Sequence, residues 1–223
     1  MAKALKYLLV TNWAAIVFLP AAAAVVLLLC ILSGVPGGAD NLFSTYFASM
    51  PSLLIIVLFV FGCTLSSSTL HVALSFGCRR KDYFLALQGI VVIYAAVAWA
   101  IHLILCRLPA LLPWTANFQT MARMLNTTFW LYPLLALGMT FLGCLCGLVF
   151  TRSRRVAVLL YALSFGVMIG VTTSLAIAWM GETNGEISPA QSPFILAAAA
   201  ITVGIVILAE VLLGRFIRRY CVK

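Results

Sequence analysis

The chain has 223 residues, of which 65% are hydrophobic and 9% charged, and its mean hydropathy is +1.16. Because soluble domains carry about 25% charged residues, this composition excludes an ordinary soluble globular protein. The net charge of +9 comes from 14 Lys and Arg against 5 Asp and Glu, and the basic residues lie between apolar runs. That distribution indicates membrane-surface loops and no nucleic-acid partner.

Apolar runs long enough to cross a bilayer recur along the whole chain. They predict an all-α integral membrane protein whose single domain covers residues 1–223. The six predicted spans are residues 13–33, 51–70, 83–105, 128–150, 156–180 and 193–213.

Basic residues cluster at every second connection between these spans. Since Lys and Arg are enriched in cytoplasmic loops, the clusters predict that both termini are cytoplasmic. Asp40, Glu182 and Glu186, together with Arg107 and Arg123, belong to the opposite set of loops. The four clusters are Lys3 and Lys6; Arg79, Arg80 and Lys81; Arg152, Arg154 and Arg155; and Arg215, Arg218, Arg219 and Lys223.

Two short amphipathic helices are expected beside the first two spans. Residues 1–12 carry leucines next to Lys3 and Lys6, which suits a helix on the inner membrane surface. Asp40 or Asn41 could cap a second helix, which would reach Met50 and lie in the outer interface.

Small and polar residues predict where the helices pack closely. The hydroxyls of residues 66–69, Ser-Ser-Ser-Thr, can bond to carbonyls of the preceding turn or of a neighbouring helix. The pairs Gly143 and Gly147, and Gly166 and Gly170, have the GxxxG spacing that lets two helix backbones approach. A tight turn over residues 151–155 makes the fourth and fifth spans antiparallel neighbours.

Seven cysteines are present, most of them inside apolar runs, and this odd number is not a disulfide framework. We interpret Cys144 and Cys146 as small packing residues. A bridge between Cys30 and Cys106, both near the outer face, is an alternative that their positions leave open.

Glu210 is the one carboxylate inside a predicted span. Charges buried in a membrane are usually paired or functional. The alternatives are an ordinary pairing, with Arg215 or with interfacial water, and a gating role for Glu210.

The connection after the second span has both apolar and basic residues. Its apolar residues predict one side of a short amphipathic helix over residues 70–77, which Gly77 would end. A purely topological role is the alternative, because most basic turns between membrane helices only set orientation. The apolar residues are Val72, Ala73, Leu74 and Phe76, and the basic residues are Arg79, Arg80 and Lys81.

The chain has no Gly-x-x-x-x-Gly-Lys-Ser/Thr loop, no His-Glu-x-x-His pair and no Gly-x-Ser-x-Gly elbow. We therefore expect neither ATP binding nor enzymatic activity in this chain.

The connection resembles the cytoplasmic turn of ABC-2 type transporter permeases, the membrane subunits of bacterial ABC exporters. That family has six spans and the pattern Ser-x-Gly-x-Ser/Thr-Arg-Lys followed by an aromatic residue. This chain departs from it at Arg79, where the family often has a hydroxyl that caps the next helix; Asp82 could take over that role. The matching residues are Ser75, Gly77, Arg80, Lys81, Tyr83 and Phe84.

The resemblance implies a coupling helix, between the second and third spans, that docks on a separate cytoplasmic ATPase. It implies two ATPase copies carrying ATP and Mg²⁺, a second copy of this permease or a related one, and no cofactor in this chain. It also implies a bacterial cell membrane and export of an amphipathic peptide, lipid or hydrophobic drug. The implied ATPase-coupling residues are Leu74, Ser75, Phe76, Gly77, Arg79, Arg80 and Lys81.

Two other classes of protein remain as alternatives. One is the substrate-binding S-component of an energy-coupling-factor vitamin importer, which also has six spans and no ATPase motif. The other is a non-transporting membrane sensor or immunity protein. A copurifying small molecule would favour the first, and purification without any ATPase would favour the second.

Overall fold

A computed structural model describes residues 2–32, 39–111, 131–180 and 192–219, and this part of the chain is all-helical, with six helices and no strand. Five helices are long and apolar enough to cross a membrane, which is the helix set of a multi-pass membrane protein. The acidic loop with Glu182 and Glu186 and the start of the predicted span 128–150 lie outside the described residues. The helices are α1 (Ala2–Leu32), α2 (Ala39–Ser75), α3 (Arg80–Leu111), α5 (Leu131–Arg152), α6 (Arg154–Met180) and α7 (Ser192–Arg219).

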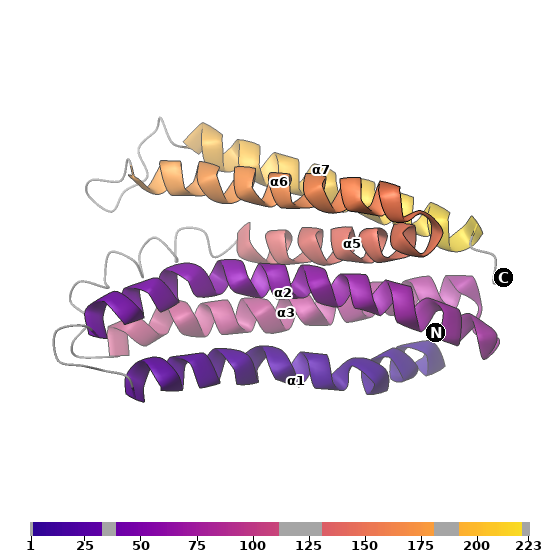
Figure 1. The fold of residues 1–223 in the computed structure, drawn as a ribbon, viewed down its shortest axis with the longest axis horizontal. Helices are drawn as coiled ribbons and strands as arrows, with labels where there is room; N and C mark the ends of the chain where they lie inside the picture. The colour runs from indigo at the N-terminus through magenta and orange to yellow at the C-terminus, as the bar shows by residue number, and fades with distance from the viewer. Residues whose placement is uncertain (1, 33–38, 112–130, 181–191, 220–223) are drawn as a thin grey trace.

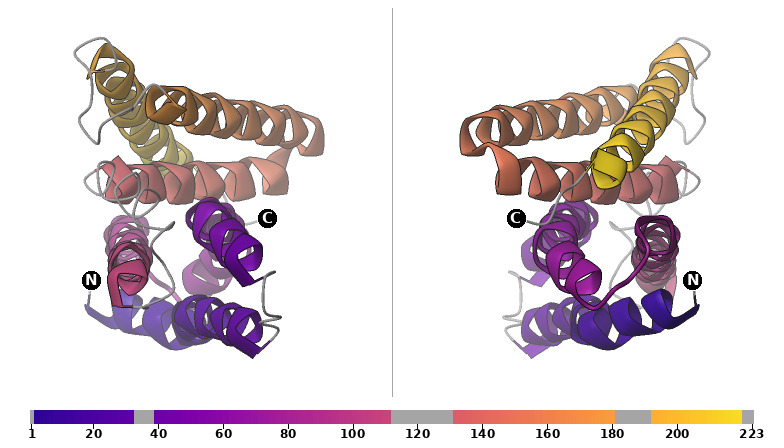
Figure 2. Two further views of the ribbon diagram at one scale, coloured as in Figure 1. Left: turned by 90° about the vertical axis from the view of Figure 1, so that its left-hand side faces the viewer. Right: turned by 90° about the vertical axis from the view of Figure 1, so that its right-hand side faces the viewer.

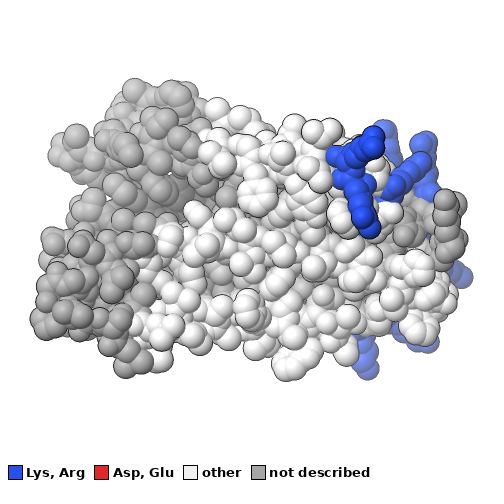
Figure 3. Space-filling view, viewed as in Figure 1, with Lys and Arg blue, Asp and Glu red and all other residues white. Residues whose placement is uncertain are grey.

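The helices run back and forth, so that the start of α1, the α2–α3 and α5–α6 connections and the end of α7 share one end of the bundle (Figure 1). Lys and Arg side chains gather over that end in Figure 3. The alternating charge pattern predicted this grouping, while the side of the membrane that it faces stays a prediction. We call this the basic end; its residues are Lys3, Lys6, Arg79, Arg80, Lys81, Arg152, Arg154, Arg155, Arg215, Arg218 and Arg219.

Helix α5 lies in the middle of the bundle, between α2 and α3 on one side and α6 and α7 on the other (Figures 1 and 2). Its buried residues continue without a break from Gly138 to Val149. The α5–α6 connection is the predicted tight turn, because α5 ends at Arg152 and α6 begins at Arg154.

Glycines bring α2 and α5 into backbone contact. A Cβ atom added at Gly147 would lie 3.0 Å from the carbonyl carbon of Cys63, and one added at Gly143 would lie 3.0 Å from that of Phe59. A Cβ at Gly166 on α6 would instead meet nothing within 4 Å. Of the two GxxxG pairs, the one on α5 therefore serves close packing inside the bundle.

Hydroxyl groups near the end of α2 use both kinds of partner that the sequence predicted. Ser66 Oγ donates a hydrogen bond of 2.6 Å to the carbonyl of Cys144 on α5. Ser68 Oγ donates instead to the carbonyl of Thr64 in its own helix. The Thr69 hydroxyl lies 2.9 Å from the hydroxyl of Tyr83, so it links α2 to α3.

Three predicted short helices are not separate helices. Residues 2–12 continue into α1, and the hydroxyl of Thr11 and the amide of Asn12 donate to the carbonyls of Tyr7 and Leu8 one turn earlier. The predicted outer helix to Met50 and the predicted coupling helix over residues 70–77 are the two ends of α2. Pro51 lies inside this helix, and no glycine or proline interrupts it between residue 63 and its end at Ser75.

Three cysteines of the described part, Cys106, Cys144 and Cys146, are buried. Cys144 and Cys146 are fully buried in α5, as predicted. Cys106 is buried and is a free thiol, so the alternative bridge from Cys30 is not formed.

Candidate functional site

The α2–α3 connection is a compact, well-defined helix end. Gly77 has φ = 78°, a left-handed conformation that glycine adopts without the cost of a Cβ clash. Its N–H donates to the carbonyl of Leu74 at 3.0 Å, and the N–H of Cys78 donates to that of Ala73 at 3.1 Å. These two bonds form a Schellman motif, so the helix stop predicted at Gly77 is confirmed.

The apolar residues before Gly77 do not share one face. Ala73 is buried and Leu74 is half-buried against the core, whereas Val72 is exposed and Phe76 is 82% exposed. Ser75 is also exposed, and its hydroxyl donates to the carbonyl of Val72. The connection therefore presents the aromatic ring of Phe76 outward, at a helix end closed by the Schellman motif.

The three cations after Gly77 have different environments. Arg79, Arg80 and Lys81 are all exposed. Nη1 of Arg80 donates a hydrogen bond of 2.9 Å to the backbone carbonyl of Arg218, in the last turn of α7. Because the last carbonyls of a helix lack partners within the helix and carry partial negative charge, Arg80 caps α7.

The carbonyl of Arg79 accepts the N–H of Tyr83 at 3.0 Å, which starts α3. Asp82 lies in the first turn, where a carboxylate is favoured by the helix dipole. Arg79 thus precedes the first turn of α3, and Asp82 supplies the negative charge at this helix start.

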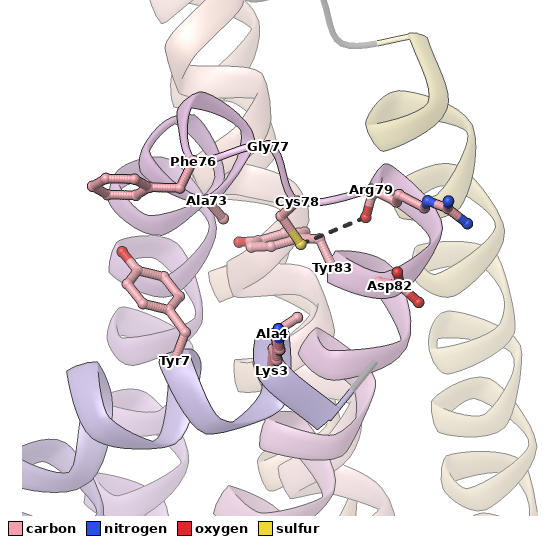
Figure 4. A pocket seen from close by; sticks show the side chains of 10 residues that line it. All are labelled: Lys3, Ala4, Tyr7, Ala73, Phe76, Gly77, Cys78, Arg79, Asp82 and Tyr83. Atoms are coloured by element: carbon pink, nitrogen blue, oxygen red, sulfur yellow. Dashed lines mark hydrogen bonds between the residues drawn. The ribbon is translucent and has the colours of Figure 1, made fainter.

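A cavity of about 670 Å³ lies between the start of α1 and the α2–α3 connection (Figure 4). Phe76 and Tyr7 stand on one side of it, and the guanidinium of Arg79 points away from them. The cavity is open to the surface beside Phe76. Its lining residues are Lys3, Ala4, Tyr7, Ala73, Phe76, Gly77, Cys78, Arg79, Asp82 and Tyr83.

Cys78 lies in this connection, outside the candidate spans. Partial burial raises the pKa of its thiol above the ordinary value, and the nearby carboxylate of Asp82 raises it further. The thiol is therefore in its protonated form near neutral pH.

Glu210 has a partner that the sequence did not indicate. Its Oε1 accepts a hydrogen bond of 2.6 Å from Nε2 of Gln88 on α3, and the contact is partly buried. The sequence left Arg215 and interfacial water open as partners, whereas this contact joins two helices that lie far apart in the sequence. A polar residue at position 88 inside an apolar span was the available signal, but nothing local connects it to Glu210.

The described residues contain no group of three or more His, Cys, Asp or Glu side chains arranged to hold a metal ion. The chain matches no family model, no curated protein and no solved structure.

Proposed function

We propose that this chain is the membrane subunit of an ATP-driven exporter and that the α2–α3 connection binds a separate cytoplasmic ATPase. The observation that carries the proposal is Phe76, whose ring is 82% exposed at the helix end that precedes the exposed cations Arg79 and Lys81 in the chain.

An exposed aromatic ring at this place favours a protein partner. Burying a phenylalanine side chain contributes about 1.5–3 kcal/mol, and aromatic and arginine residues are common centres of binding energy at interfaces. The ring is anchored, because the Schellman motif fixes the backbone on its C-terminal side. The backbone at this position therefore loses little conformational freedom when a partner covers the ring.

The exposed cations Arg79 and Lys81, which follow Phe76 in the same connection, would orient an acidic surface of the partner. In the proposed assembly, two ATPase subunits carry ATP and Mg²⁺, and two copies of this chain, or one copy and a related permease, receive their motion. The basic end then faces the cytoplasm of a bacterial cell. The proposed cargo is an amphipathic peptide, lipid or hydrophobic drug, the class that the resemblance to the exporter permeases implies.

The test is copurification of an ATPase with the tagged chain from its own cells, followed by measurement of ATP turnover. Phe76→Ala, and separately Arg79→Glu with Lys81→Glu, should weaken ATPase binding and abolish the stimulated turnover. Arg80 is left unchanged, because its role as the cap of α7 would confuse the result.

The matched control is Arg154→Glu with Arg155→Glu, which makes the same change of charge at another connection of the basic end. Equal loss in both charge variants would show that only net charge matters. Normal ATPase binding by the Phe76→Ala variant would contradict the proposal. A copurifying small molecule would instead support an S-component, and purification without any ATPase a non-transporting protein.

A further inference from the structure

Three of the contacts between α3 and α7 follow one line along each helix. At the surface, Arg80 donates to the carbonyl of Arg218. One turn deeper, the ring of Phe84 covers Gly214, where an added Cβ would lie 3.3 Å from Cζ. One turn deeper again, Gln88 donates to Glu210. We call these three pairs the α3–α7 seam: Arg80 and Arg218, Phe84 and Gly214, and Gln88 and Glu210.

The regular spacing shows why the seam forms. Residues four apart lie on the same face of a helix, and here positions 80, 84 and 88 meet positions 218, 214 and 210 on an antiparallel neighbour. Gln88 lies eight residues beyond Arg80, so the last pair is about 12 Å deep at 1.5 Å per residue.

These contacts all lie in the basic half of the bundle. Figure 2 shows α7 close to the α2 and α3 layer at the basic end and rising away from it toward the other end. On one side of the seam the neighbouring side chains Leu85 and Val211 are exposed, whereas on the other side Leu87 and Leu213 are buried in the core.

The seam starts at the α2–α3 connection, which is the proposed binding site of the ATPase. Arg80 is the first residue of α3 and lies four positions after Phe76. A displacement of the connection would therefore act on the start of α3, and through Arg80 on the end of α7.

We infer that the α3–α7 seam is a latch that opens and closes the basic half of the bundle during transport, with Gln88 and Glu210 as its positioning pair. The inference rests on the proposed function. When the latch is closed, the hydrogen bond between Gln88 and Glu210 satisfies two polar side chains that lie inside two apolar helices. Open, the same two groups face the space between the helices, where the polar part of an amphipathic cargo can bond to them.

The experiment locks the latch with zinc. Phe84→His with Gln88→His places two imidazoles four residues apart on α3, opposite the carboxylate of Glu210, which together form a three-ligand zinc site. The control variant is Ile207→His with Val211→His, which puts the same pair on an exposed face of α7 and bridges nothing. Zinc chloride is added to each variant and to the wild-type chain, and EDTA then removes it.

In the isolated chain, zinc should raise the apparent Tm of the seam variant more than that of the control. In the complex with its ATPase, the stimulated ATP turnover of each protein in EDTA is its own reference, because Phe84→His with Gln88→His itself changes the seam. Zinc should abolish that turnover in the seam variant, EDTA should restore it to the reference, and zinc should leave the control and the wild type at their references.

Two results would overturn the latch. Absence of the zinc-dependent rise in Tm would show that the three side chains do not converge. A rise in Tm with undiminished ATP turnover would show that the seam stays closed throughout the cycle. A wild-type chain that stimulates no ATPase is a different result, because it removes the proposed function itself.

Discussion

Replacing Gly147 with alanine should push α2 away from α5 and lower the stability of the bundle. The new Cβ would lie 3.0 Å from the carbonyl carbon of Cys63, and closer still to the oxygen of that carbonyl. Since carbon atoms pack best at about 3.5–4.0 Å, the two backbones must separate by at least about 0.5 Å. Neither group can rotate away, because both belong to helix backbones.

The stability lost through overpacking should exceed the stability gained from the higher helix propensity of alanine. Overpacking typically costs about 1–3 kcal/mol, and a rigid backbone neighbour favours the upper part of that range. The better helix propensity of alanine stabilises the helix by up to about 1 kcal/mol relative to glycine. For a chain of this size about 1 kcal/mol moves Tm by about 2–4 °C, so the apparent Tm should fall by several degrees.

The assay is thermal unfolding in detergent, followed by tryptophan fluorescence, with Gly166→Ala as the matched control. Gly166 has the same spacing pattern on α6, but an added Cβ there meets nothing within 4 Å. That variant should keep or raise the apparent Tm through the propensity term alone. Equal shifts in the two variants would refute the close approach of α2 and α5.

Two further predictions concern single polar groups. Ser66→Ala removes the hydrogen bond from α2 to the carbonyl of Cys144 and should lower the free energy of unfolding by about 0.6 kcal/mol, the average for such bonds in membranes. Ser68→Ala removes a bond that stays within α2, so it should lower the stability less in the same unfolding assay. Cys78 should react slowly with maleimide at neutral pH and faster as the pH rises, because the thiolate reacts and its pKa is raised. Asp82→Asn removes a negative charge that helps to raise this pKa, so labelling of Cys78 at a fixed pH should become faster. The rate is measured by mass spectrometry of the labelled peptide. An unchanged rate would contradict the effect of the Asp82 carboxylate on the thiol.

The contact of Arg80 with α7 changes how the basic connection is understood. All three of its cations resemble partner-binding residues in the sequence, yet one of them caps a helix of its own chain. Only Arg79 and Lys81 therefore enter the proposed contact with the ATPase, and Arg80 belongs to the seam that would transmit its motion.

The amino-acid sequence by itself determined the class of fold, the approximate helix positions, the shared basic end and the stop at Gly77. These features follow from hydropathy, charge and the conformational freedom of glycine, which act over a few residues or a single helix. The tertiary structure decided that Phe76 is exposed while Ala73 is buried, that Gly147 rather than Gly166 lies in a helix contact, and that Glu210 bonds to Gln88. Such pairings depend on how helices distant in the sequence pack side by side, and no local pattern contains that information.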